Sequence, residues 1–190
     1  MQDENDVDGY NYRTSRVYFG KQLKPKTFGK QEIMNITEAS SADLDAICVL
    51  SNQINWDHHN NVPTVFNSPA TMGSDKDFWR ALIDSENSIF FVARHEDKIQ
   101  GFITARITQN LKVVFLSKDK ICRVGTIVVS KEHRSKGIGR SLMDKVELWA
   151  KKSGAKEIRL EVMEFNTSAQ AFYKSDGYDI QSRILAKPIA

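Results

Sequence analysis

The feature that most constrains the fold is a short basic turn between a strongly apolar segment and an amphipathic one. Residues 121–129 have the composition of a buried strand, and the apolar spacing of residues 138–152 predicts a helix. Gly137 and Gly139 lie where the chain enters that helix and leave its backbone N–H groups uncovered. The first N–H groups of a helix lack partners and carry the positive end of its dipole. The turn therefore predicts an anion-binding site.

The net charge of the chain is concentrated at this turn. The chain has 27 Lys and Arg against 24 Asp and Glu, a formal net charge of +3. Residues 131–140 hold four Lys or Arg and one Glu, which is also +3, so the rest of the chain sums to zero. Nucleic-acid binders carry a basic stripe or patch, so this class is disfavoured. One compact polyanion, such as a pyrophosphate, fits better.

Strands and helices alternate along the chain, which predicts an α/β fold on a mixed sheet. The expected strands are 33–37, 88–94, 99–107, 121–129, 157–162 and 178–186, of which 88–94 and 99–107 form a hairpin. The expected helices are 41–56, one that begins at Ser74, 138–152 and 167–175, with polar connections at 57–71 and 108–120. Residues 1–30 show no period, so we expect an N-terminal arm followed by one domain over 31–190.

Cysteine content and hydropathy indicate in which cellular compartment the protein is expected. Cys48 and Cys122 lie 74 positions apart without the Cys/His spacing of a zinc site, so we expect reduced, packed thiols and no metal. No apolar run approaches the length of a membrane span, and residues 1–8 lack the regions of a signal peptide. These patterns predict a cytoplasmic protein with no membrane partner.

The turn also carries a recognisable motif. Arg134-Ser135-Lys136-Gly137-Ile138-Gly139 fits the pattern R/Q-x-x-G-x-G/A, and Leu142 excludes the third glycine of a dinucleotide fingerprint. With the later segments Leu160-Glu161-Val162, Asn166-Thr167-Ser168-Ala169 and Phe172-Tyr173, the sequence resembles the GCN-five-related N-acetyltransferase (GNAT) family over roughly residues 121–180. The resemblance implies a mixed, mostly antiparallel sheet that is splayed at an acetyl-CoA cleft and flanked by helices.

The same resemblance implies where acetyl-CoA, the expected co-substrate, would bind. The pyrophosphate would lie on the backbone of the turn, the pantetheine arm would run along the preceding strand, and Asn166 would contact the arm from the opposite wall. The implied binding residues are Ile127, Val128, Val129, Arg134, Ser135, Lys136, Gly137, Ile138, Gly139, Arg140, Ser141, Asn166 and Tyr173.

Acetyl transfer to an amine needs an acid for the departing thiolate and a base for the amine proton. Tyr173 matches the tyrosine that many family members place beside the CoA sulfur, although an ordinary packed tyrosine is the alternative. Many members carry a carboxylate on the strand before the turn, where this sequence has Gly125 and Thr126. Glu161 is the alternative base, as in the ribosomal-protein N-terminal alanine acetyltransferases.

Two other interpretations of these acid and base candidates stay open. Glu161 could equally be the ionic partner of Arg159 or of a nearby lysine, and His58 or His59 could act as base through water.

The acceptor is expected to be a primary amine of a small molecule, protein or peptide. It would enter between the first two helices, the 108–120 connection and the final strand, past Trp56, Asp57, His58 and Phe66. Two functions fit the sequence: an acetyl-CoA-dependent N-acetyltransferase that works by direct attack of the amine, and a non-catalytic acyl-CoA sensor of the same fold. Family members are often dimers, so a homodimer is a further expectation.

Overall fold

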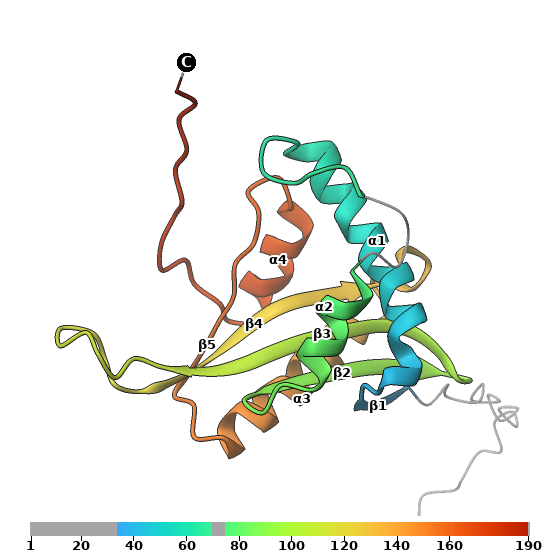
Figure 1. Ribbon diagram of the computed structural model, residues 1–190, viewed down its shortest axis with the longest axis horizontal. Helices are drawn as coiled ribbons and strands as arrows, with labels where there is room; N and C mark the ends of the chain where they lie inside the picture. Colours follow the sequence, from blue (N-terminus) through green and yellow to red (C-terminus); the bar gives the residue numbers. More distant parts are fainter. Residues whose placement is uncertain (1–33, 70–74, 190) are drawn as a thin grey trace, which may run out of the picture. The chain divides into compact units, whose positions relative to one another are not determined.

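The computed structural model describes residues 34–69 and 75–189 (Figure 1). The chain divides into two units, Met1–Gln31 and Glu32–Ala190, and the described residues belong to the second. The expected arm, residues 1–30, lies outside the described residues. The arm and its boundary therefore stay predictions.

Within the described residues, five strands form one sheet in the order β1-β2-β3-β4-β5. They are β1 (Asn35–Glu38), β2 (Ser88–His95), β3 (Lys98–Gln109), β4 (Lys120–Val129) and β5 (Glu157–Arg159). The pairs β1–β2, β2–β3 and β3–β4 are antiparallel, and only β4–β5 is parallel. This confirms the expected mixed, mostly antiparallel sheet. A parallel pair needs a crossover connection, and here a helix supplies it.

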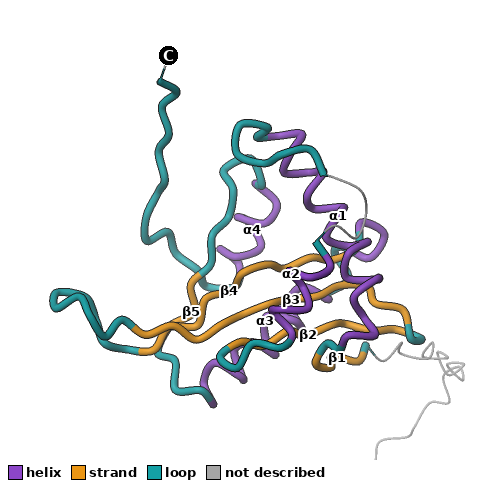
Figure 2. The backbone as a smooth tube through the Cα atoms, viewed as in Figure 1, coloured by secondary structure: helices purple, strands orange, loops and turns teal. Residues whose placement is uncertain are grey.

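Helices cover both faces of the sheet (Figures 1 and 2). They are α1 (Leu44–Asn61), which follows a 3-10 turn (Ser41–Asp43), α2 (Lys76–Ile83), α3 (Ile138–Lys152) and α4 (Thr167–Ser175). The helices α1 and α2 pack on one face, and α3 packs on the other. Among the described residues, no helix has the length and apolar character needed to cross a membrane.

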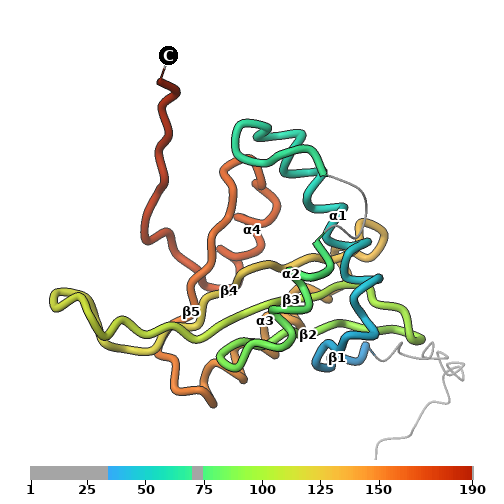
Figure 3. The backbone as a smooth tube through the Cα atoms, in the orientation of Figure 1, coloured from blue at the N-terminus to red at the C-terminus, as the bar shows by residue number. Residues whose placement is uncertain are grey.

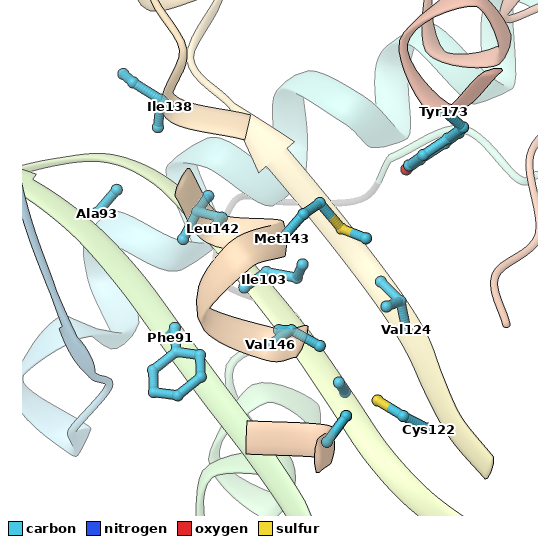
Figure 4. Close-up of a cluster of buried hydrophobic side chains, with 12 residues drawn as sticks. Phe91, Ala93, Ile103, Cys122, Val124, Ile138, Leu142, Met143, Val146 and Tyr173 are labelled. Carbon is cyan, nitrogen blue, oxygen red and sulfur yellow. The ribbon is translucent and has the colours of Figure 1, made fainter. Parts of the chain in front are cut away.

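Side chains of the strands alternate between two hydrophobic clusters, as a pleated sheet requires. Phe91, Ile103 and Cys122 face α3 (Figure 4), whereas Phe90 and Phe102 face α1 and α2. The sheet therefore has no polar face, which explains why its strands read as nearly continuous apolar runs.

The two cysteines are packed as the sequence predicts. Cys48 and Cys122 are both buried and unpaired. Burial raises the pKa of each thiol to about 11, so both stay protonated at neutral pH.

Two expected helix boundaries are wrong. Helix α1 continues to Asn61 instead of ending near Trp56. The polar residues beyond Trp56 stay helical because they return hydrogen bonds to the preceding turn: Asn61 donates to the Asp57 carbonyl at 2.7 Å. Helix α2 has Asp75 at its N-cap instead of Ser74, which lies outside the described residues.

Two expected strands are also wrong. Strand β5 ends at Arg159 instead of Val162, and residues 178–186 form no strand. Both segments have the apolar alternation of strands, but a strand needs a hydrogen-bonded neighbour, and after Arg159 the chain separates from β4. By contrast, α3 and α4 span the residues that the sequence predicts.

Candidate active site

Strand β5 pairs with only the first part of β4. Their pairing ends at Arg123 and Arg159, while β4 continues to Val129. Beyond Arg123, no described strand pairs with this edge of β4. Backbone groups on that edge are therefore free to bind an extended ligand as an added strand would. This is the splayed cleft that the sequence predicts. The side chains of Ile127 and Val129 pack toward α3 and that of Val128 toward α1.

A β-bulge at Gly125 bends β4 at the start of this cleft. Thr104 pairs with Thr126, but Ala105 pairs with Val124, so Gly125 is the extra residue. Beside the bulge, the Thr126 N–H donates to the Thr104 hydroxyl at 3.0 Å. No bulge was predicted at Gly125, which the sequence marked only as a position without the carboxylate of many family members. A glycine within an apolar strand is itself a signal for a bulge.

At the far end of β4, the basic turn leads into the N-terminus of α3. Gly137 is the N-cap residue with φ of +83°, a left-handed conformation that glycine adopts without strain, and no side chain caps the helix. Ser135 also has a positive φ of 61°. The Ile138 side chain is buried against the sheet, so only its backbone faces outward. Ser141 donates its N–H to the Gly137 carbonyl at 3.0 Å.

The first turn of α3 thus presents uncapped N–H donors at the mouth of the cleft. Such donors, backed by a lysine, suit a pyrophosphate group. Lys136 is exposed and has no ion pair with any described residue.

Two other cations of the turn are held by Asp57 of α1. The Asp57 carboxylate lies 3.0 Å from the Lys131 Nζ and 3.6 Å from an Arg134 guanidinium nitrogen. Arg134 also donates to the Val129 carbonyl at 3.2 Å. The Lys131 N–H in turn donates to the Gln53 side chain at 3.3 Å. These contacts attach the second half of α1 to the basic turn.

The remaining cation of the turn, Arg140, points to α4. Its guanidinium lies 2.5 Å from the Asp176 carboxylate and 6.0 Å from the centroid of the Phe172 ring. A Cβ added to Gly139 would lie 3.8 Å from Phe172 and 3.9 Å from Val129. Both are ordinary van der Waals distances, so the packing of α3 against α4 and β4 leaves room for a methyl group at this position.

Tyr173 of α4 lies where the two strands separate. It is 8% exposed and packs in the same cluster as Val124, and Figure 4 shows its hydroxyl directed toward β4. The hydroxyl forms no hydrogen bond with a described residue. Every side-chain N or O atom of the described residues that lacks solvent exposure has a hydrogen-bond partner, so the unpaired hydroxyl oxygen of Tyr173 keeps some solvent exposure. Burial of the ring raises the pKa of Tyr173 to about 12.

Asn166 begins α4 at the other wall of the cleft. Its Oδ1 accepts hydrogen bonds from the Ala169 N–H and the Ser168 hydroxyl, both at 3.1 Å. The structure thus gives Asn166 a capping role. Its Nδ2 has no partner among the described residues and keeps the capacity to donate to a ligand.

Glu161 is not the ionic partner of Arg159 or of a described lysine, which was the alternative to its role as base. Arg159 instead pairs with Glu157, at 2.7 Å. Glu161 is exposed beyond the end of β5 and forms no hydrogen bond or ion pair with a described residue. The Glu161 carboxylate is therefore not neutralised by a described side chain.

The two histidines belong to helix α1, not to a loop. The His58 Nδ1 lies 2.8 Å from the Ile54 carbonyl, and the His59 Nδ1 lies 2.9 Å from the Phe66 carbonyl. A carbonyl only accepts, so each Nδ1 donates and each Nε2 is left as the acceptor in the neutral ring. The His58 ring packs against Phe165, with centroids 5.5 Å apart. Phe165 directly precedes Asn166 and was not identified from sequence.

Only some of the segments that were expected to line the acceptor entrance lie together. Asp57 and His58 lie toward the α3 end of β4 through their contacts with Lys131 and Phe165. The 110–119 connection lies at the opposite end, where Gln109 pairs with Lys120, and the final strand is absent. Ten residues of strand span about 30 Å. That connection therefore does not join the wall formed by α1.

Comparisons with known proteins agree with this geometry. Residues 55–178 match the model of the acetyltransferase (GNAT) family. The chain is 24% identical over 146 residues to an uncharacterized N-acetyltransferase, YhfO, of Bacillus subtilis, which covers 77% of this chain and 90% of that protein.

Two solved structures share the fold. A mutant of the BH1408 protein of Bacillus halodurans superposes with a TM-score of 0.79 at 24% identity, covering 83% of this chain and all of that one. The aminoglycoside N-acetyltransferase AAC(6')-Iy in complex with CoA superposes with a TM-score of 0.67 at 18% identity, covering 85% and 97%.

Proposed function

The chain belongs to the acetyltransferase (GNAT) family, and from this premise we propose that it transfers the acetyl group of acetyl-CoA to a primary amine by direct attack. The observation that carries the proposal is the position of three features along one strand edge. The edge of β4 is unpaired beyond Arg123, the uncapped N-terminus of α3 follows it, and Tyr173 lies beside it. In this order, the three features suit the pantetheine arm, the pyrophosphate and the sulfur of acetyl-CoA.

The residues present fit acetyl-CoA by their chemistry. The N–H groups of Ile138 and Gly139, together with Lys136, are donors without acceptors among the described residues. Bound acetyl-CoA would supply an activated thioester. Arg134 and Arg140 are already paired with acids, so they would mainly flank the phosphates.

In the proposed reaction, the neutral amine attacks the thioester carbon, a C–N bond forms and the C–S bond breaks. Tyr173 donates its hydroxyl proton to the departing thiolate and later regains a proton from water. A pKa of about 12 keeps this proton in place at neutral pH. Holding both reactants in attack geometry also lowers the activation free energy.

The proton of the attacking amine goes to Glu161, directly or through water. The support is that Glu161 is exposed and unpaired among the described residues, while Arg159 is satisfied by Glu157. His58 is the alternative, since its Nε2 is free to accept a proton. The exposed carboxylate of Glu161 also favours a cationic acceptor.

A thiol-release assay over an amine panel tests the proposal. The panel holds an aminoglycoside, a polyamine, a peptide with a free N-terminus and a peptide with an internal lysine. We expect acetyl-CoA-dependent turnover with at least one of them, and an acetylated product by mass spectrometry. Calorimetry with CoA runs in parallel. Binding without transfer to any amine would favour the acyl-CoA sensor, and absence of binding would contradict both functions.

A further inference from the structure

The connection between β3 and β4 carries a run of apolar side chains that face solvent. Val114 and Phe115 are 91% and 88% exposed, and Leu111, Val113 and Leu116 are exposed as well. None of the five packs against either hydrophobic cluster of the described residues. Figure 3 shows this connection, in yellow-green, extending beyond the sheet at the end where β3 pairs with the start of β4.

Hydrogen bonds hold the tip of this connection in a defined turn. The Leu116 N–H donates to the Val113 carbonyl at 3.3 Å, which places Val114 and Phe115 at the two central positions of a β-turn. The Lys118 Nζ donates to the same carbonyl at 2.7 Å. Central positions of surface turns usually hold Gly, Pro, Asn, Asp or Ser. A valine and a phenylalanine there serve neither the turn nor the core.

Lysines surround this tip. Lys112 and Lys118 flank it in sequence, and Lys120 follows at the start of β4. The Lys156 N–H donates to the Lys120 carbonyl at 2.9 Å, which brings a fourth lysine to the same end of the sheet. All four side chains are exposed and form no ion pair with a described residue, and residues 110–118 contain no acid. The tip is therefore an apolar projection with a positively charged rim.

We propose that the 110–119 connection docks this protein on a membrane surface that contains anionic lipids. Val114 and Phe115 enter the boundary between headgroups and acyl chains, and the lysines of the rim contact the negative headgroups. Such a surface is negative outside and apolar beneath, and the tip matches it, with apolar side chains outermost and cations behind them. Lysine suits this place because its stem lies along apolar material while its ammonium stays with the headgroups.

The shape of the tip favours a membrane over a protein partner. A stable protein interface buries at least about 1,000 Å² between complementary surfaces. The apolar side chains here project from a single β-turn, which offers a small convex surface. A lipid boundary adapts to a convex projection, whereas a protein would need a matching groove.

Docking through this loop requires neither of the features whose absence led the sequence to predict no membrane partner. Those features were an apolar span and a signal peptide, and a loop that lies at the membrane boundary uses neither. The basic turn lies at the other end of β4, about 30 Å from the connection. It therefore stays in water when the tip is docked. The docking does not depend on the proposed reaction, and its test needs no acetyl-CoA.

Flotation with lipid vesicles is the first test. We expect the full chain to float with vesicles of phosphatidylcholine and phosphatidylserine in equal amounts, but not with phosphatidylcholine alone. The double variant Val114→Ser, Phe115→Ser should bind at least about tenfold more weakly, because two large apolar side chains are lost from the boundary. The matched variant Ile184→Ser, Leu185→Ser changes residues that are 85% and 90% exposed in the last described segment, and should bind as the wild type does.

A charge variant tests the rim. Lys112→Gln should weaken binding to the mixed vesicles about fivefold, the usual contribution of one lysine near an anionic surface. Lys174→Gln removes an exposed lysine from α4 and should leave binding unchanged. No flotation of the wild type with the mixed vesicles would overturn the proposal and leave a protein as the partner of the tip. Equal binding to both kinds of vesicle, or equal losses in the test and control variants, would overturn it too.

A polarity-sensitive fluorophore on the tip is the second test. Val114→Cys supplies an exposed thiol for the label, whereas Cys48 and Cys122 are buried and should not react. We expect the emission of this label to shift to shorter wavelength when the mixed vesicles are added. The same label on Leu185→Cys should show no shift. Vesicle binding without a shift at residue 114 would place another surface against the membrane and overturn the proposal.

Discussion

The carboxylate of Asp57 lies 3.0 Å from the Nζ of Lys131, across 74 positions of sequence. This contact joins helix α1, which we propose to line the acceptor side, to the turn that would hold the phosphates. Asp57 also faces Arg134, so one acid neutralises part of the charge of the turn. A phosphate group entering the turn would compete with Asp57 for both cations.

Asp57→Asn should therefore tighten CoA binding. Removing the competing carboxylate leaves Lys131 and Arg134 free for phosphate, and partly exposed ion pairs contribute about 0.2–1 kcal/mol, or up to about fivefold in Kd. Calorimetry with CoA at low and high salt checks this, because the gain should shrink as salt screens the charges. Asp45→Asn, which removes an exposed α1 carboxylate paired with Lys76, should leave Kd unchanged. Weaker CoA binding to the Asp57 variant would show that the contact shapes the turn and does not compete.

Tyr173→Phe should lower turnover by about 10²–10⁴-fold, the usual contribution of a general acid, and leave the Kd of CoA near that of the wild type. The wild-type tyrosine, with its pKa at about 12, should not limit kcat up to about pH 10, because the acid loses its proton only above that range. Tyr178→Phe is the matched control. The Tyr178 ring meets the Tyr173 ring edge to face with centroids 5.7 Å apart, and burial also raises the pKa of Tyr178, yet it should be dispensable for turnover. Full activity of the Tyr173 variant would exclude this residue as the acid.

Glu161→Gln should reduce kcat/KM by at least about 10²-fold at neutral pH if Glu161 is the base. The loss should shrink at high pH, where more of the amine is neutral without assistance. Glu164→Gln removes an exposed carboxylate from the same segment and should have little effect. Should Glu161→Gln keep wild-type activity while His58→Gln loses it, the base would be the histidine of α1.

Gly137→Ala should weaken CoA binding and destabilise the fold by about 1–2 kcal/mol, because alanine is strained in the left-handed conformation. An added methyl group would meet no atom within 4 Å, so the effect comes from the backbone alone. Gly154→Ala is matched in both respects, with φ of +80° and open space around it. It should lower the melting temperature similarly but spare CoA binding. Equal CoA binding by both variants would contradict the role of the α3 N-terminus.

Asp43→Asn should reduce both the stability of the fold and its dependence on acidic pH. Burial opposes ionisation of Asp43, but the Arg94 guanidinium at 2.7 Å and hydrogen bonds from Ser40 outweigh it and hold the pKa of Asp43 below its ordinary value of 3.8. A depressed pKa stabilises the folded state above about pH 4, and this contribution is lost as pH falls through the folded-state pKa.

Urea unfolding of the Asp43→Asn variant between pH 7 and pH 2 measures this contribution. At pH 7 we expect a loss of about 1–3 kcal/mol in the free energy of unfolding, as for a buried hydrogen-bonded acid. The variant should differ less from the wild type near pH 2. Asp45→Asn, in which the acid is 88% exposed, should change neither value appreciably. A constant difference across this pH range would assign the effect to packing.

Sequence by itself determined helices α3 and α4 and the turn that precedes α3. Helices α3 and α4 have the predicted bounds because each of their bonds joins residues four positions apart. The turn with Gly137 could likewise be identified, since its uncapped N–H groups follow from its position before α3. The family resemblance of residues 121–180 rested on such local patterns.

Only the tertiary structure decided which segments find partners far along the chain. Strand β5 ends at Arg159 because β4 diverges there, and residues 178–186 form no strand because their backbone pairs with no described strand, although both segments have the alternation of strands. Asp57 meets Lys131, 74 positions further along the chain, through the same long-range folding. A strand forms only where another strand pairs with it, and an ion pair forms only where the opposite charge lies close. Apolar alternation in the sequence does not specify which segment supplies that partner.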